Sequence, residues 1–311
     1  MTTGGRTLHL IGAATDIGAA DRGSSMGPDA LRVAGLDRAL RRLGHEVIDR
    51  GNLAGPPNPE AQARDGYRHL AETVTWCQAV HDAVLASLGE GALPILLGGD
   101  HSLAIGSIAA VARHCAATDQ ALSVLWLDAH ADFNTPQSSP SGNLHGMPVA
   151  VVTGHGPEAL LALGHRVPMV APSQIIQIGI RSVDHQEKAA VEESGITVYD
   201  MRRVDEMRMR RVMEAALDQI QRTGGHVHLS FDVDFLDPSV APGVATTVTG
   251  GPTYREAQLA MEMIHDAVTI GSLDIAELNP ALDLRNQTAE VTVELIASAF
   301  GEQILARHER T

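Results

Sequence analysis

Short apolar runs alternate with longer amphipathic stretches along the chain, and this alternation constrains the fold more than any other feature. The clearest apolar runs are Pro94–Leu97, Leu122–Leu127, Ile175–Ile180 and His226–Phe231. About eight such runs, each separated from the next by a helical segment, indicate parallel strands with helices on both faces of the sheet. We therefore expect an α/β protein built on a parallel sheet.

The same reading gives approximate bounds for the other elements. Further strands are expected at Leu8–Gly12, Glu46–Asp49, Ile196–Tyr199 and Ser272–Ile275. Helical spacing predicts helices over Pro28–Leu43, Ala61–Leu88, Ser102–Ala116, Arg208–Arg222, Thr253–Ala267 and Ala289–Ala306. The 311 residues contain no internal repeat and no obvious linker, so we expect a single catalytic domain over residues 1–311.

Composition argues against several classes of partner. Acidic residues outnumber basic ones 38 to 23, a formal charge of −15 that disfavours nucleic acid and anionic membrane surfaces. No apolar run approaches the length of a membrane-spanning helix. The two cysteines, Cys77 and Cys115, form no CxxC motif, which fits a reducing cytoplasm and argues against a cysteine-based zinc site.

Three potential metal ligands follow the apolar run Leu122–Leu127. Asp128, His130 and Asp132 occupy alternate positions, and alternate side chains of an extended chain point to the same side. A curl in the backbone would direct all three at one metal ion, or at two ions about 3.5–4 Å apart. The alternative interpretation is an ordinary polar loop after a buried strand.

Other potential ligands also lie directly after predicted strands. His101 follows Pro94–Leu97, Asp232 and Asp234 follow His226–Phe231, and Glu277 follows the last strand. The carboxyl ends of parallel strands meet at one edge of the sheet, where sites form in such proteins. This shared placement favours a metal centre over unrelated polar loops.

The residue types indicate the chemistry of this edge. Four aspartates and two histidines without cysteine suit Mn²⁺ better than a structural zinc ion. Four carboxylates would balance two divalent ions, and the ions would lower the pKa of a shared water to give hydroxide near neutral pH. His145 has a side chain suited to moving a proton, although a lone loop histidine is equally compatible with a surface role.

These motifs carry a resemblance to a known family. Three segments resemble the ureohydrolase signatures: Gly98-Gly99-Asp100-His101-Ser102, Asp128-Ala129-His130-Ala131-Asp132, and Ser230-Phe231-Asp232-Val233-Asp234 with Leu236-Asp237-Pro238. Within that superfamily, two segments resemble the arginase family: Ser141-Gly142-Asn143-Leu144-His145-Gly146 and Glu277-Leu278-Asn279-Pro280. The resemblance extends from Ile11 to the final helix.

The resemblance implies a fold and a reaction. The fold would be a three-layer α/β/α sandwich around a central, mostly parallel eight-stranded sheet. The reaction would be hydrolysis of L-arginine to L-ornithine and urea, by attack of a metal-bridging hydroxide on the guanidinium carbon. It also implies two Mn²⁺ per subunit and a homotrimer or homohexamer.

It further implies roles for individual residues. The metal ligands would be His101, Asp128, His130, Asp132, Asp232 and Asp234, with Asp128 and Asp232 bridging. Asp132 would accept a proton from the hydroxide, His145 would be the proton shuttle, and Glu277 would pair with the guanidinium. Asn134, Ser141 and Asn143 would contact the substrate carboxylate, Asp184 and Glu187 the α-ammonium, and Thr246 would line the pocket.

Some residues depart from the family pattern or attract a different interpretation. Ala245-Thr246-Thr247 stands where the family usually has Gly-Thr-Pro, and Arg181 is followed by Ser182 where an aspartate is common. His226 and His228 share the strand face of Asp232 but lie upstream, so we do not expect them to bind metal. Asp100 and Asp237 are expected to support turns or ligands, Arg208, Arg210 and Arg211 to form a solvated helix face, and Trp76 and Trp126 to be core residues.

Three alternatives remain. A sibling amidinohydrolase of the agmatinase or guanidinobutyrase type would keep the metal ligands and Glu277 but would lack the amino-acid contacts. A mononuclear zinc deacetylase on a related fold would not need His101 and Asp132 as ligands. A non-catalytic metal-binding homologue would usually have lost a ligand, whereas every expected ligand is present.

Overall fold

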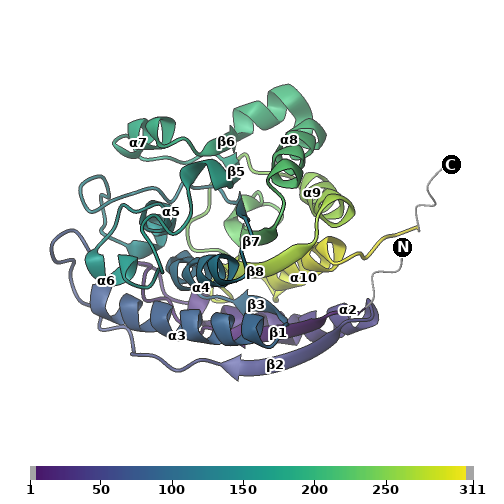
Figure 1. Ribbon diagram of the computed structural model, residues 1–311, viewed down its shortest axis with the longest axis horizontal. Coiled ribbons are helices and arrows are strands. Elements are labelled where there is room, and N and C mark those ends of the chain that lie inside the picture. The colour runs from purple at the N-terminus through teal and green to yellow at the C-terminus, as the bar shows by residue number, and fades with distance from the viewer. Residues whose placement is uncertain (1–4, 306–311) are drawn as a thin grey trace.

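The computed structural model describes residues 5–305 and contains one eight-stranded sheet in which every strand pairing is parallel. The strands are β1 (Thr7–Gly12), β2 (Glu46–Asn52), β3 (Leu93–Leu97), β4 (Leu122–Leu127), β5 (Ile175–Ile180), β6 (Thr197–Asp200), β7 (His226–Asp232) and β8 (Ile270–Ala276). Their spatial order is β2-β1-β3-β8-β7-β4-β5-β6 (Figure 1). The predicted parallel sheet is confirmed.

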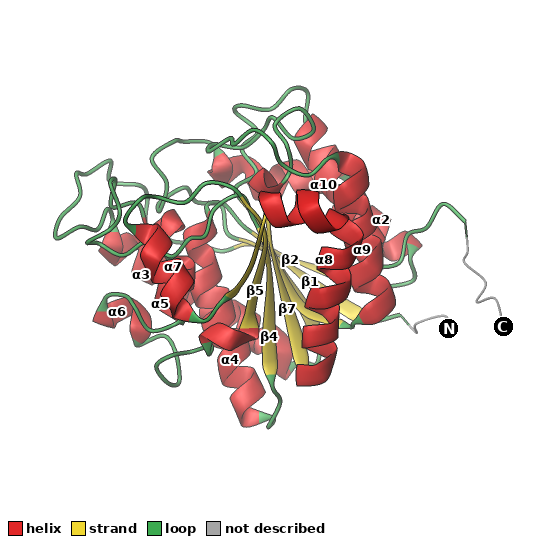
Figure 2. Cartoon of the chain, turned by 90° about the horizontal axis from the view of Figure 1, so that it is seen from above, coloured by secondary structure: helices red, strands yellow, loops and turns green. Residues whose placement is uncertain are grey.

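Helices cover both faces of the sheet and complete a three-layer sandwich (Figure 2). One face packs against α1 (Gly27–Ala34), α2 (Leu36–Arg42), α8 (Met201–Thr223), α9 (Tyr254–Ala267) and α10 (Gln287–Ala299). The other packs against α3 (Leu70–Gly89), α4 (Ala104–Ala117), α5 (Pro148–Val152) and α6 (Glu158–Leu161), with α7 (Glu187–Ser194) at its margin. The sandwich buries two separate apolar clusters, one on each side of the sheet.

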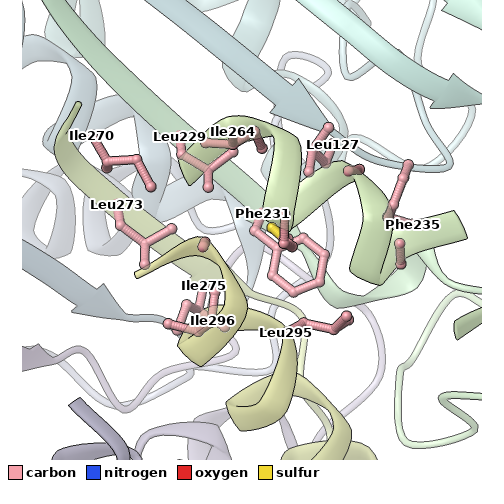
Figure 3. Packing of buried hydrophobic residues seen from close by; sticks show 14 of the residues in the cluster. Leu127, Leu229, Phe231, Phe235, Ile264, Ile270, Leu273, Ile275, Leu295 and Ile296 are labelled. Atoms are coloured by element: carbon pink, nitrogen blue, oxygen red, sulfur yellow. The ribbon is translucent and has the colours of Figure 1, made fainter. Parts of the chain in front are cut away.

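Alternate residues of the central strands supply each cluster. Leu229 and Phe231 of β7 and Leu273 and Ile275 of β8 point to the α9 and α10 face, where Ile296 packs against them (Figure 3). The intervening residues of β7 and β8 face α4 instead, because successive side chains of a strand point to opposite faces. On that face the buried side chains of β7 and β8 are largely polar.

Two predicted helices begin or continue differently from expectation. The helix predicted over Ala61–Leu88 begins only at Leu70, because proline-rich chain and a left-handed turn at Gly66 precede it. The helix predicted over Pro28–Leu43 is two helices, broken where Gly35 adopts φ 87°. Non-helical chain therefore replaces the start of the first predicted helix, and a left-handed glycine divides the second.

Two later helices also have different bounds. The helix predicted from Arg208 starts at Met201, where the Asp200 side chain accepts a hydrogen bond from the Arg203 amide, and Arg208 itself marks a kink. The helix predicted to run to Ala306 ends at Ala299. Ala306 lies outside the described residues. Among residues 5–305, no helix combines the length and apolar character needed to cross a bilayer.

The strand order determines which chain segments meet at the carboxyl edge of the sheet. The five adjacent strands β3, β8, β7, β4 and β5 occupy its middle. These are the strands that precede His101, Glu277, Asp234, Asp128 and Asp184, respectively. The topology therefore brings together segments that are far apart in the sequence.

Candidate metal centre and catalytic cleft

A first cluster of potential ligands gathers around His101, which follows β3. Its Nδ1 atom lies 2.8 Å from Asp232 Oδ2, 3.1 Å from Asp128 Oδ2 and 3.4 Å from Asp132 Oδ2. All four side chains are buried. The His101 Nδ1 atom has no hydrogen-bond partner, so this ring nitrogen and the carboxylate oxygens around it converge on one point. This is the arrangement that a cation requires.

A second cluster shares Asp128 with the first. His130 Nδ1 lies 3.0 Å from Asp234 Oδ2 and 3.5 Å from Asp128 Oδ1. Asp128 therefore directs one carboxylate oxygen toward each cluster, which is the geometry expected of a bridging ligand. Among the described residues, Asp232 belongs only to the first cluster.

The buried carboxylates cannot all be ionised unless positive charge is near them. Burial, followed by repulsion from neighbouring carboxylates, raises the pKa of Asp132 and of Asp232 well above the usual range. Burial opposes protonation of the histidines, but the surrounding aspartates outweigh it and raise the pKa to about 9 for His101 and about 12 for His130. The cluster therefore needs positive charge among its carboxylates, and its oxygen and imidazole donors fit divalent ions.

Trp126 and Ser230 hold the side chains of His101 and Asp128 in their orientations. The Trp126 ring stacks on the His101 ring with centroids 4.1 Å apart, and its Nε1–H donates to Asp128 Oδ2 at 2.8 Å. Ser230 Oγ lies 2.9 Å from His101 Nε2, which leaves Nδ1 directed toward the carboxylates. Trp126 is buried as predicted, but its indole also has a polar role that the sequence did not reveal.

Glu277 connects the metal-ligand clusters to the neighbouring cleft. Its Oε1 accepts a hydrogen bond from the His101 amide at 2.8 Å and lies 3.0 Å from His145 Nδ1. Its Oε2 is buried and has no hydrogen-bond partner. Burial raises the pKa of Glu277. The charge of His145, followed by the hydrogen bonds that Glu277 accepts from His145 and from the His101 amide, outweighs burial and lowers the pKa overall. The carboxylate is therefore an ionised acceptor that can bind a cationic group.

Backbone strain coincides with these residues. Asp132 and Glu277 adopt φ of 52° and 62°, in the left-handed region that non-glycine residues rarely occupy. The surrounding hydrogen bonds hold Glu277 there, since its amide donates to the Gly99 carbonyl. Such strain persists where the fold over-determines a functional conformation.

The predicted substrate-binding residues are linked to one another. The Asn134 side-chain amide donates to Asp184 Oδ2 at 2.9 Å, and its Oδ1 accepts from Ser138 Oγ. Glu187 accepts hydrogen bonds from the backbone amides of Phe133 and Asp184 through its two carboxylate oxygens. Glu187 thus holds the loop after β4 against the loop after β5, in addition to any contact with a ligand.

An open cleft with a volume of about 210 Å³ lies above both clusters. All predicted site residues except Asp128 line it, and Asp128 lies beneath the surface at 0% exposure. Four further residues line the cleft that the sequence did not single out for binding: Ser139, Pro140, Gly146 and Ser182. The volume suits a small molecule.

Arg181 holds the loop that carries the unusual Ala245-Thr246-Thr247 segment. Its guanidinium donates to five backbone carbonyls, including those of Asp234 at 2.8 Å and Val248 at 2.9 Å. These bonds connect the segment next to Thr246 with the segment that bears the candidate ligand Asp234. The hydrogen bonds to the Val248 carbonyl therefore anchor the chain directly after Thr247.

Several residues for which the sequence predicts structural roles belong to neither ligand cluster. His226 and His228 bond to Ser272 within the sheet and are not in either ligand cluster. Asp237 accepts hydrogen bonds from the Ser239 amide in its own turn and from the Gly250 amide, and Asp100 caps the 3-10 turn His101–Leu103. Trp76 is buried, while Arg208, Arg210 and Arg211 are exposed. These placements agree with the structural roles predicted for them.

Ser230 and Trp126 were the functional residues that sequence reasoning missed. Each lies on a strand two positions before a candidate ligand, Ser230 before Asp232 and Trp126 before Asp128. The period of two along a strand places them on the ligand's face. This spacing can be read from the sequence, but it does not distinguish a residue that supports a ligand from an ordinary core residue.

The fold and the site together define a class. A parallel α/β/α sandwich carries two adjoining carboxylate–imidazole clusters at the carboxyl edge of its sheet, with an ionised glutamate facing a small cleft. This is an α/β protein with a candidate two-cation centre.

Comparison with known proteins gives the family. The model of the Arginase family matches residues 6–301. The arginase of Brucella melitensis biotype 1 is 44% identical over 300 residues, covering 96% of this chain and 97% of that protein. The native structure of Bacillus caldovelox arginase at pH 5.6 superposes with a TM-score of 0.91 at 42% identity, covering 96% of this chain and 100% of that one. The chain belongs to the arginase family and is a hydrolase of that family.

A more distant neighbour shares only the fold. A structure titled as a hypothetical agmatinase from Burkholderia thailandensis has a TM-score of 0.72 at 23% identity, covering 96% of this chain and 85% of that one.

Proposed function

We propose that this protein hydrolyses L-arginine to L-ornithine and urea and holds two Mn²⁺ ions per subunit. The convergence of His101, Asp128 and Asp232 around an unpaired Nδ1 atom is the observation that carries the proposal. The similarity to proteins named arginase over nearly the whole chain supports the choice of substrate.

The ligand types support manganese. His101, Asp128, His130, Asp132, Asp232 and Asp234 would hold the ions, with Asp128 shared between them. Carboxylate oxygens with two imidazoles suit Mn²⁺, and neither cysteine belongs to a ligand cluster among the described residues. When bound, the ions would lower the pKa of a shared water and thereby supply the nucleophile near neutral pH.

The chain's own residues would bind the substrate and move the protons. Glu277 Oε2, buried and without a partner, would accept hydrogen bonds from the substrate guanidinium, for which a carboxylate is the matching acceptor. Asp132 would accept a proton at the floor of the cleft. His145, held 3.0 Å from Glu277, would deliver a proton to the departing ornithine nitrogen.

The far side of the cleft would bind the amino-acid group. Asn134, Ser141 and Asn143 would contact the substrate carboxylate, and Asp184 and Glu187 would attract its α-ammonium, with Thr246 at the rim. The hydrogen bond from Asn134 to Asp184 links both contacts, so they would bind the two ends of an α-amino acid together. Agmatine lacks the carboxylate and would lose half of these interactions.

The test is urea formation from L-arginine, from agmatine and from guanidinobutyrate, each with and without preincubation in Mn²⁺. We expect manganese-dependent urea from arginine and little from agmatine. Strong activity on agmatine or guanidinobutyrate alone would assign the protein to a sibling amidinohydrolase. A protein that binds manganese but releases no urea would be the non-catalytic homologue.

Other properties stay predictions. We infer one catalytic domain over residues 1–311, supported by the single eight-stranded sheet, in which β3 from the first half of the chain pairs with β8 from near its end. The cytoplasm is the inferred compartment, in keeping with two free thiols at Cys77 and Cys115. A homotrimer or homohexamer is the inferred assembly, which size-exclusion chromatography with light scattering would measure.

A further inference from the structure

A buried polar stripe runs beneath the candidate metal centre on the α4 face of the sheet. In β7 it contains His228 and Ser230, and in β8 it contains Ser272 and Asp274. The strand register pairs His228 with Ser272 and Ser230 with Asp274. None of these four residues is more than 2% exposed or lines the cleft. The stripe therefore has no direct role in binding a substrate.

Asp274 lies at the centre of a hydrogen-bonded group within this stripe. Its Oδ1 accepts a hydrogen bond from Ser107 Oγ at 2.6 Å, and its Oδ2 lies 3.1 Å from His228 Nε2. The other ring nitrogen of His228 lies 2.8 Å from Ser272 Oγ. Each polar side-chain atom of Asp274 and His228 thus has a partner. We call Ser107, His228 and Asp274 the sheet clamp.

The sheet clamp joins three elements that each deliver a site residue. Ser107 lies in α4, which follows His101 after a single 3-10 turn. His228 lies in β7, which ends at Asp232, and Asp274 lies in β8, directly upstream of Glu277. If one of these elements shifted along the other two, its site residue would move relative to the other two site residues.

The clamp also lies next to the support of His101. Ser230 is the register partner of Asp274, and its Oγ lies 2.9 Å from His101 Nε2. Asp274 thus lies beside the serine that orients this ligand, and His228 lies two residues before that serine on the same strand.

Stability alone does not account for a carboxylate and an imidazole in this core. Burying such groups carries a desolvation cost, and well-packed apolar residues of similar volume often stabilise a core as well or better. The opposite face of the same strands is filled by Leu229 and Leu273 in that way. Directional hydrogen bonds, unlike apolar contacts, set one register.

We propose that Asp274, His228 and Ser107 are positioning residues for the metal centre. They hold α4, β7 and β8 in the one register in which His101, Asp232 and Glu277 converge. This inference rests on the proposed manganese centre.

The test measures manganese affinity by titration of the free Mn²⁺ electron paramagnetic resonance signal. His228→Leu removes the donor to Asp274, and we expect it to weaken manganese binding about tenfold, at the lower end of losses seen for outer-shell partners. His228→Gln places an amide nitrogen near the position of Nε2, and we expect it to keep affinity within about threefold of wild type. Ser107→Ala is the milder variant and should weaken binding less than His228→Leu.

Leu273→Ala is the matched control, because it removes packing from the opposite face of the strand that carries Asp274. It should lower the melting temperature by several degrees and leave manganese affinity unchanged. Unchanged affinity in both His228→Leu and Ser107→Ala, or an equal loss in Leu273→Ala, would overturn the inference. Wild-type protein that binds no manganese would instead overturn the proposed function.

Discussion

The half-buried His145 and the buried Glu277 form a pair in which each residue has a separate proposed task. Attraction between them raises the pKa of His145 against the opposing effect of burial. A protonated imidazole next to the substrate's guanidinium site is well placed to donate to a leaving amine. The pair therefore combines substrate orientation with proton delivery.

Replacing the imidazole should separate these tasks. In His145→Asn we expect kcat to fall about 10²-fold while two manganese ions stay bound, because His145 is not in either ligand cluster. Steady-state kinetics and metal analysis of the same sample measure both quantities. His155→Asn is the control outside the cleft. An unchanged kcat would remove His145 from proton transfer.

Asp128 offers a second test at this scale. Asp128→Asn replaces the shared carboxylate with a neutral amide, so we expect loss of manganese as well as turnover. Metal content after gel filtration, measured by atomic absorption, should fall below two ions per subunit. Asp205→Asn on an exposed helix position controls for charge alone. Full manganese content in Asp128→Asn would contradict the bridging role.

At the scale of elements, loops rather than strands hold the rim of the cleft. Arg181 connects the end of β5 with the segment after β7 and with Val248, near Thr246. A lysine at this position carries its donors on one nitrogen and cannot reach five carbonyls spread around a planar guanidinium. The rim therefore depends on the shape of one side chain.

Arg181→Lys should loosen this rim. We expect KM for arginine to rise several-fold with a smaller change in kcat, and faster amide hydrogen exchange over residues 245–248. Hydrogen-exchange mass spectrometry and kinetics measure these effects. Arg202→Lys, in an exposed pair with Glu206, is the control. Equal exchange in both variants would show that Arg181 does not hold the loop.

At the scale of the whole molecule, stability should depend on a histidine far from the cleft. Burial, followed by the charges of His228, His114 and Arg6, lowers the pKa of His226 to about 3. An unfolded chain binds this proton near pH 6.5, so the folded state loses stability as pH falls from about 6.5 toward 3. The slope from this residue is about 1.4 kcal/mol per pH unit.

His226→Gln removes the titrating group and should reduce this slope. Urea unfolding of wild type and variant between about pH 6.5 and 4 measures the difference, since other titrating groups contribute equally to both. His185→Gln, at an exposed position, should leave the slope unchanged. Parallel stability curves for wild type and His226→Gln would contradict the prediction.

Much of the architecture could be predicted from local pattern. Short apolar runs identify β4 and β7, and Asp128 and Asp232 follow from where those runs end. Helix bounds were less accurate, as at Leu70 and Ala299, because proline, glycine and tertiary packing end helices that periodicity would extend. Trp126 and Ser230 orient the His101 ring, but in the sequence alone they could not be distinguished from core residues.

By itself, the sequence determined that buried parallel strands end in carboxylates and imidazoles, because strand period and residue type are local properties. Only the tertiary structure decided which of these side chains meet. The order of the strands brings β3, β8, β7 and β4 together, so that His101 and Asp232 come within 2.8 Å. Contacts between residues 131 positions apart depend on packing and register, which no local pattern contains.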